Sequence, residues 1–213
     1  MQKKVVTLLF IAIMTINNVP AQEGTVIPLA EPERTGGMPL FEALDKRQTI
    51  RTYKPVELSP QDLSNLLWAA FGINREDGRR TAPSARNWKH FDIYLITAGG
   101  WYLYEPQDHA LIKLGNEDLR EHAGGQDFVQ TAPLNLIFVS DQDRITGINP
   151  ERKDFYSLVD AGFISQNVYL FCTSEGLATV VRAAIDKENL HKVLKLKPSQ
   201  QVVLAQTVGY PGE

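Results

Sequence analysis

The spacing of hydrophobic residues predicts a chain in which helices and strands alternate. Apolar positions recur at helical spacing within residues 39–44, 60–71 and 153–175, and a weaker pattern predicts a helix over 117–122. Asp186 is placed to cap one more helix. Short apolar or alternating runs predict strands over residues 91–97, 101–104, 109–114, 133–140 and 201–208. Gly99-Gly100 would form the turn between the first two of these strands. This mixture predicts an α+β fold.

Two of the predicted helices carry further information. Ser59 precedes Pro60 and Asp62, which is the residue order of a capped helix start. The pattern over 153–175 is apolar around much of its circumference, so we expect this helix at the centre of the core. Its apolar surface exceeds what one small domain readily covers, which favours a partner subunit.

The beginning of the chain is typical of a secretory signal. Lys3 and Lys4 precede an apolar run over residues 5–16, and Val19-Pro20-Ala21 supplies small residues before Gln22. We therefore expect residues 1–21 to be a signal peptide, and the protein to be exported, periplasmic or otherwise extracytoplasmic. The alternative is a buried N-terminal helix. Residues 22–38 are rich in glycine and proline and predict an irregular arm, followed by one domain over 39–213.

Composition and charge exclude several classes of function. The chain has 213 residues, of which 43% are hydrophobic and 22% charged, as in an ordinary globular protein. Its net charge of −3 gives no basic excess for nucleic acid. A single cysteine, Cys172, excludes an intramolecular disulfide, and four histidines without metal-ligand spacing predict no metal site. Because no side-chain catalyst is evident, a cofactor is expected to carry the chemistry of any enzyme here.

Three segments have the residues to hold an anionic cofactor. Arg47, Thr49 and Arg51 alternate, so an extended chain would direct two guanidinium groups and a hydroxyl to one side. The alternative is a solvated strand face. Residues 83–88 form a loop of small and amide-bearing side chains, or simply a connection. Residues 176–184 lead from a strand to small residues that would leave backbone N–H groups open to a ligand.

The order of these segments resembles the nitroreductase family of flavin enzymes over about residues 39–211. The resemblance rests on the motifs Arg47-Gln48-Thr49-Ile50-Arg51, Ala82-Pro83-Ser84-Ala85-Arg86-Asn87, Gly125-Gln126, Asp160-Ala161-Gly162, Gly176-Leu177-Ala178 and Val208-Gly209-Tyr210-Pro211. The hairpin around 101–104 is similar to the branch that includes SagB-type dehydrogenases. The family implies a mixed, mainly antiparallel sheet flanked by helices, an intertwined homodimer, and FMN at each of two interface sites.

The resemblance also implies a role for each matching residue. Arg47 and Thr49 would meet the FMN phosphate, and Arg51 would lie near the phosphate or the N1–C2=O edge. Gln126 would face the pyrimidine edge, while a backbone N–H of Ala183 or Ala184 would lie close to N5 and O4. The loop 83–87 would come from the partner subunit. The whole implied set is Arg47, Gln48, Thr49, Arg51, Pro83, Ser84, Ala85, Asn87, Gln126, Val181, Arg182, Ala183 and Ala184.

The chain departs from the family pattern after its Gly-Tyr-Pro segment. Many members continue there with a basic phosphate ligand, whereas only Gly212 and Glu213 follow here. Arg182 or Arg86 is the expected replacement. The aromatic residues of loop and hairpin are expected either to line a substrate slot or to pack in the core; they are Trp88, Trp101, Tyr102 and Tyr104.

The resulting functional hypothesis is an FMN-dependent oxidoreductase. It would pass hydride or electrons through flavin N5 to or from a small organic substrate such as a nitroaromatic or a quinone. NAD(P)H is one candidate donor, although it is scarce outside the cytoplasm. The alternatives are a dehydrogenase of a specific small molecule or peptide-derived ring, and a flavin-binding protein without enzymatic activity.

Overall fold

The computed structural model describes residues 24–213. The predicted signal peptide, residues 1–21, lies outside this range, so it stays a prediction. Within the described part, none of the helices combines the length and the hydrophobicity that crossing a membrane requires.

A seven-stranded sheet forms the centre of the molecule, and every neighbouring pair of strands is antiparallel. Its spatial order is β1-β4-β3-β2-β5-β7-β6. The strands are β1 Thr25–Pro28, β2 Phe91–Thr97, β3 Gly100–Glu105, β4 Ala110–Gly115, β5 Leu134–Asp141, β6 Ala178–Arg182 and β7 Gln200–Gly209. The α+β fold class and the five strands predicted from the hydrophobic pattern are confirmed.

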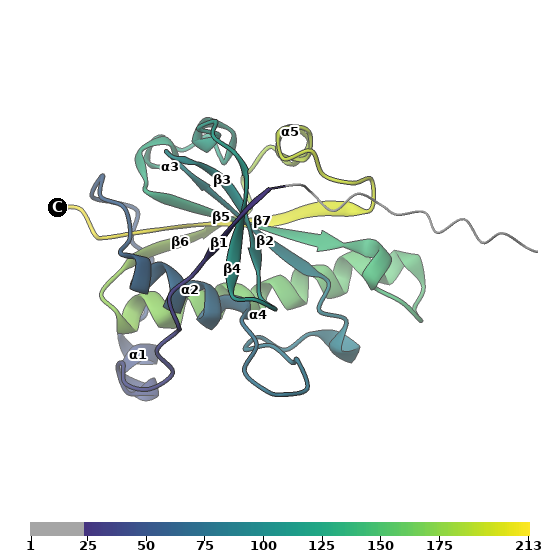
Figure 1. Cartoon of the computed structure of the whole chain (residues 1–213), viewed down its shortest axis with the longest axis horizontal. Coiled ribbons are helices and arrows are strands. Elements are labelled where there is room, and N and C mark those ends of the chain that lie inside the picture. Colours follow the sequence, from purple (N-terminus) through teal and green to yellow (C-terminus); the bar gives the residue numbers. More distant parts are fainter. Residues whose placement is uncertain (1–23) are drawn as a thin grey trace, which may run out of the picture.

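Helices cover both faces of this sheet (Figure 1). Seen nearly along the sheet, α1, α2 and α4 lie on one side, and α3 and α5 on the other. The helices are α1 Leu40–Lys46, α2 Pro60–Phe71, α3 Asp127–Thr131, α4 Lys153–Ser174 and α5 Lys187–Val193. The long α4 runs beneath the sheet, as its apolar pattern predicts.

The side chains of β2 show how the two layers divide the core. Ile93 and Leu95 join the cluster packed by α2 and α4, whereas Tyr94 and Ile96 join the cluster packed by α5. This alternation is the two-residue period of a strand covered on both faces. The neighbouring β5 is buried along all eight residues for the same reason.

The helix ends follow their local sequence. The Ser59 hydroxyl accepts a hydrogen bond from the Asp62 amide at 3.0 Å and caps α2, and the Asp186 carboxylate caps α5 through Asn189. At the end of α4, Gly176 takes a φ of +69°, which allows the Leu177 N–H to donate to the Cys172 carbonyl at 2.7 Å.

Two predicted segments differ from the structure. Residues 25–28 are not irregular: they form β1, which pairs with β4 at the edge of the sheet. The helix predicted over 117–122 is only a 3₁₀ turn, Arg120–His122. The Asp118 carboxylate accepts from both the amide and the guanidinium of Arg120, which supplies an alternative to helical bonding for this short stretch.

An apolar surface remains uncovered on the helical side of the chain. Phe155, Leu158, Val159 and Phe163 of α4 are 37–59% exposed. Phe41 of α1 is 87% exposed. Contiguous apolar surface of this kind marks an interaction site in a soluble protein. The excess hydrophobicity of α4 noted in the sequence is therefore present as exposed surface.

Candidate cofactor site

The hydroxyl of Tyr169 brings together two segments that are distant in the sequence. Its oxygen lies 3.0 Å from the Thr49 hydroxyl oxygen and accepts the Val181 N–H at 3.1 Å. The Ile50 N–H also donates to the Thr179 carbonyl at 3.1 Å. The stretch 47–51 therefore runs beside β6, although it is not a strand of the sheet. Two of the three segments expected from sequence, 47–51 and 181–184, therefore meet.

Two arginines lie on the stretch 47–51. Arg47 lies with its guanidinium carbon 5.3 Å from the centre of the Tyr169 ring, and Arg51 is exposed. In residues 24–213, no carboxylate lies within ion-pair distance of either side chain. Ala183 and Ala184, which follow β6, are also exposed. Such cations next to open backbone suit the phosphate and polar edge of a nucleotide-like ligand.

Gln126 is a further candidate acceptor, and it lies near Gly124 and Arg182. Its Oε1 atom is buried and has no hydrogen-bond donor among the described residues. It lies next to Gly124, where an added Cβ would come within 3.1 Å of this oxygen. A buried carbonyl oxygen without a donor costs about 1–3 kcal/mol, which the N–H of a flavin pyrimidine edge would offset. The residues present therefore fit the implied cofactor.

Arg182 has a different place from the one expected. Its side chain donates to the Ala123 carbonyl, the Asn135 side-chain oxygen and the Thr207 hydroxyl at 2.6–3.1 Å. Burial lowers the pKa of Arg182 to about 10, opposed by the nearby Tyr53. This guanidinium ties β6 to its neighbours, so it is not available as the phosphate ligand that we expected from the sequence.

Arg86, the other expected replacement, is exposed but engaged at the surface. It donates to the Gly147 carbonyl at 2.8 Å, and its guanidinium carbon lies 5.9 Å from the centre of the Trp88 ring. The first contact ties the side chain to the connection between β5 and α4, and the second keeps it beside its own loop. The structure thus leaves Arg47 and Arg51 as the cations of the candidate phosphate site.

Asp160 of α4 anchors the loop that contains residues 84–87. Its carboxylate accepts the Ala85 N–H at 3.1 Å, and burial raises the pKa of Asp160 against the opposing effect of hydrogen bonds from Ala85 and Ser84. The loop needs such an anchor because Arg86 and Asn87 adopt φ values of +49° and +56°, which are unusual for residues with a side chain.

The two groups of candidate residues occupy different levels of α4. Asp160 holds the loop 84–87, whereas Tyr169 holds the stretch 47–51, nine positions further on. Nine residues of helix correspond to about 13 Å along the axis. Within one chain the two groups of candidate residues therefore lie apart. We call them half-sites, because the family resemblance implies that a second subunit completes each of them.

His90 lies behind the anchored loop and is completely buried. Its Nδ1 atom is 3.7 Å from the Asp160 carboxylate, and neither ring nitrogen has a hydrogen-bond partner among residues 24–213. Burial, reinforced by the charge of Arg144, lowers the pKa of His90 to about 4 despite the opposing charge of Asp141. The ring is therefore neutral at pH 7.

The other groups considered from sequence are structural. The Cys172 thiol is buried, which raises its pKa, so it packs as a small side chain of the core. Trp101 and Tyr104 are each 3% exposed and belong to the core, while Tyr102 and Trp88 are only partly buried. In the described part of the chain, no group of three His, Cys, Asp or Glu residues could hold a metal ion.

Three residues that position the candidate segments were not among the candidates. Tyr169 and Asp160 orient the two half-sites, and Tyr53 donates its hydroxyl proton to the Ile50 carbonyl at 2.9 Å. A signal for the first two exists in the sequence: both are polar groups within an otherwise apolar helix pattern. Nothing local to Tyr53 distinguishes it.

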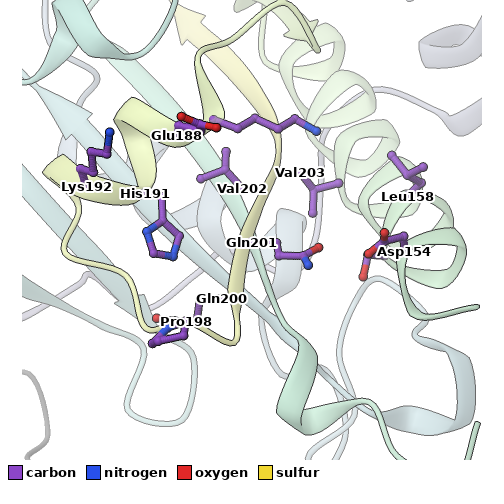
Figure 2. A pocket seen from close by; sticks show the side chains of 12 residues that line it. Asp154, Leu158, Glu188, His191, Lys192, Pro198, Gln200, Gln201, Val202 and Val203 are labelled. Carbon is purple, nitrogen blue, oxygen red and sulfur yellow. The ribbon is translucent and has the colours of Figure 1, made fainter. Parts of the chain in front are cut away.

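A separate cleft of about 520 Å³ lies between the start of α4, α5 and the first half of β7. Figure 2 shows β7 passing between α5, with Glu188 and His191, and α4, with Asp154 and Leu158. None of the candidate cofactor residues lines it. It adjoins β7 residues 200–203, beyond the part that pairs with β6.

Comparisons with known proteins agree on one family. The description "Nitroreductase family" fits residues 44–210. A Methanocaldococcus jannaschii protein named as a nitroreductase is 32% identical over 168 residues, covering 74% of this chain and 85% of the relative. A Vibrio harveyi NADPH-flavin oxidoreductase is 30% identical over 104 residues, which cover 45% of this chain and 43% of that protein. The crystal structure of a Ralstonia eutropha protein, described as a nitroreductase, matches with a TM-score of 0.84 and 39% identity, covering 92% of this chain and 93% of the other.

Removal of the Tyr169 hydroxyl is expected to destabilise the junction. In Tyr169→Phe the Val181 N–H loses its acceptor, so the free energy of unfolding should fall by about 1–3 kcal/mol. Tyr156→Phe on the same helix is the control, because that hydroxyl accepts only from the exposed Arg152. We expect it to change stability by less than about 0.5 kcal/mol in urea unfolding. Equal effects of the two variants would contradict the role of Tyr169.

The buried His90 is expected to make stability depend on pH. Its pKa is about 4 in the folded protein and ordinarily 6.5, so the unfolded chain binds the proton first on acidification. His90 should therefore lower the free energy of unfolding as the pH falls from 6.5 to 4, by at most about 3 kcal/mol. The raised pKa of Asp160 acts in the opposite direction. Urea unfolding across this range should show a shallower loss in His90→Gln, and parallel curves would contradict the assignment.

Proposed function

The chain belongs to the nitroreductase family, and we propose that it is an FMN-dependent oxidoreductase with cofactor sites shared between the subunits of a homodimer. The junction at Tyr169 carries this proposal. Within residues 24–213, Arg47 lies at this junction without an ion pair, and Arg51 is exposed four residues further on. Gln126 has a buried oxygen without a donor among the same residues, and Ala183 and Ala184 are exposed after β6. The oxidoreductase class follows from the family. FMN as the cofactor is our inference from this donor set.

Each of these residues has a role toward bound FMN, whose isoalloxazine ring supplies hydride or electron transfer. Arg47 and Thr49 would bind the phosphate, with Gln48 beside them. Gln126 would accept from the pyrimidine edge, and the segment 181–184 would flank the ring. Arg51 would stabilise negative charge that develops at the N1–C2=O edge, because a cation fixed nearby favours the charged form.

The second half-site supports a shared location. Pro83, Ser84, Ala85 and Asn87 lie on a loop held at Asp160, about 13 Å along α4 from Tyr169. A second copy that packs on the exposed apolar surface of α4 would bring its own loop toward this junction. The same contact would cover side chains such as Phe155 and Phe163, which are 59% and 43% exposed. Dimerisation and cofactor binding would then be coupled.

The substrate is proposed as a small organic acceptor such as a nitroaromatic or a quinone. NAD(P)H is the proposed donor, and the name of the Vibrio harveyi relative is consistent with it. If residues 1–21 direct export, as we propose, the donor outside the cytoplasm would have to be a different molecule or protein. Anaerobic mixing with NADPH separates these possibilities: reduction of the bound flavin supports the first, and photoreduction alone supports the second.

Substitution of Arg47 is expected to weaken FMN binding. Arg47→Ala removes a charge-assisted hydrogen bond, so the Kd for FMN should rise by about 5–150-fold, equivalent to about 1–3 kcal/mol. Titration of the apoprotein with FMN, followed by flavin fluorescence, measures this. The control is Arg75→Ala, an exposed arginine outside the junction, which should leave the Kd unchanged. Unchanged affinity in the folded Arg47 variant would place this residue on a solvated surface.

A mixture of two inactive variants is expected to restore flavin binding. One variant combines Arg47→Ala with Arg51→Ala, and the other combines Ser84→Trp with Asn87→Ala. A heterodimer would hold one intact site and one doubly damaged site, so activity per heterodimer should approach half that of the wild-type dimer. Mass spectrometry verifies that heterodimers form. Proven heterodimers without recovery would show that each chain builds its own site.

A further inference from the structure

A second cavity in the chain is strongly basic, although the protein as a whole is acidic. This basic cavity has a volume of about 630 Å³, and its charged side chains are Arg80, Lys89, Arg144, Lys195 and Lys197 against Asp92 and Glu105. The whole chain has a net charge of −3. None of the candidate cofactor residues lines the cavity. The concentration of positive charge is therefore local to this site.

The acidic side chains of the basic cavity are already engaged. Asp92 accepts two hydrogen bonds from Arg144, at 2.8 and 2.9 Å, and a third from Gln200 at 2.9 Å. Glu105 accepts the Gln107 N–H at 2.9 Å. Among residues 24–213, neither carboxylate forms an ion pair with Arg80 or with any of the three lysines. Four cations thus line the cavity without an ion pair among the described residues, and Glu105 is the carboxylate of the lining that no arginine or lysine pairs with.

Arg80 is the most constrained of these cations. Its Nε and Nη1 atoms are buried and have no acceptor in the described part of the chain. Its guanidinium carbon lies 5.5 Å from the centre of the Phe71 ring, and burial lowers the pKa of Arg80. A buried donor without an acceptor is costly, and a buried cation more so. An oxyanion of a ligand would supply the acceptor for these two donors.

The other walls of the cavity limit what this oxyanion can be. Aromatic side chains contribute to the lining, namely Phe71, Phe91, Tyr94 and Tyr104. The volume lies in the range of small-molecule sites and far exceeds a single inorganic ion. One carboxylate would pair with Arg80 alone and leave the lysines unpaired. We propose that the basic cavity binds a small organic polyanion that carries at least two carboxylate or phosphate groups.

The positions of the lysines support a ligand with several charges. Lys89 and Lys195 have left-handed backbone conformations, with φ of +50° and +51°. This conformation sets the direction in which each side chain leaves the backbone. Arg80 and Lys89 come from the connection between α2 and β2, and Lys197 comes from the turn before β7. This proposal is independent of the proposed flavin function, because it uses none of the residues at the Tyr169 junction.

The test is a titration of the purified full-length protein, with its bound flavin, by calorimetry without divalent metal. Citrate is the carboxylate probe, ADP is the phosphate probe and acetate is the singly charged control. We expect saturable one-to-one binding of citrate, ADP or both, with an unchanged flavin spectrum. Which probe binds identifies the oxyanion. Failure of both probes to bind more tightly than acetate would overturn the proposal.

Matched variants locate the binding. Arg80→Gln should weaken the probe at least about tenfold, the range for a lost charge-assisted hydrogen bond. Arg79→Gln, an exposed neighbour paired with Asp77, should change it less than about twofold. Lys197→Gln removes an exposed charge without disturbing the core, so it tests the site even where Arg80→Gln fails to fold. Equal weakening by Arg79→Gln, or none by Lys197→Gln, would overturn the assignment.

Discussion

The hydrogen bonds of the Tyr169 hydroxyl are the interaction on which the candidate cofactor site depends. This one group lies within hydrogen-bond distance of Thr49 and accepts the Val181 N–H. It therefore fixes the stretch after α1 against the strand β6, although they are more than 120 residues apart in the chain. A hydroxyl buried on a helix face can do this because it both donates and accepts. The arginines beside it gain a defined position from that junction.

The arginines of this protein show how surroundings decide the use of one side-chain type. Arg182 is buried with three acceptors and ties strands together, and Arg144 is neutralised by Asp92. Arg47 has an aromatic ring beneath it, and no carboxylate in the described chain pairs with it. Arg80 is partly buried with two unpartnered nitrogens. An arginine is available to a ligand when no carboxylate pairs with it, as for Arg47, or when its nitrogens have no acceptor in the described chain, as for Arg80.

Helix α4 joins the fold to the proposed assembly. Its buried face carries the polar anchors of both half-sites, and its outer face exposes large apolar side chains. Exposed apolar surface favours association, and the separation of the half-sites along the axis gives association a functional consequence. A site divided between subunits would couple stability, dimerisation and cofactor affinity, because a cofactor that binds only the dimer stabilises the dimer.

The sequence by itself determined the fold class, six of the seven strands, the ends of α2 and α4, and the start of α5. These features depend on the spacing of hydrophobic residues and on helix caps such as Ser59. Both are properties of neighbouring residues, so they can be read from the sequence. It missed β1, because a four-residue edge strand forms only through its partner β4. Tertiary structure alone decided that Arg182 is internally bonded, that Tyr169 and Asp160 anchor separate half-sites, and that Arg80 faces a cavity. Those outcomes depend on which groups, distant in the sequence, become neighbours in the fold. The spacing of hydrophobic residues does not indicate which polar groups will form hydrogen bonds with one another.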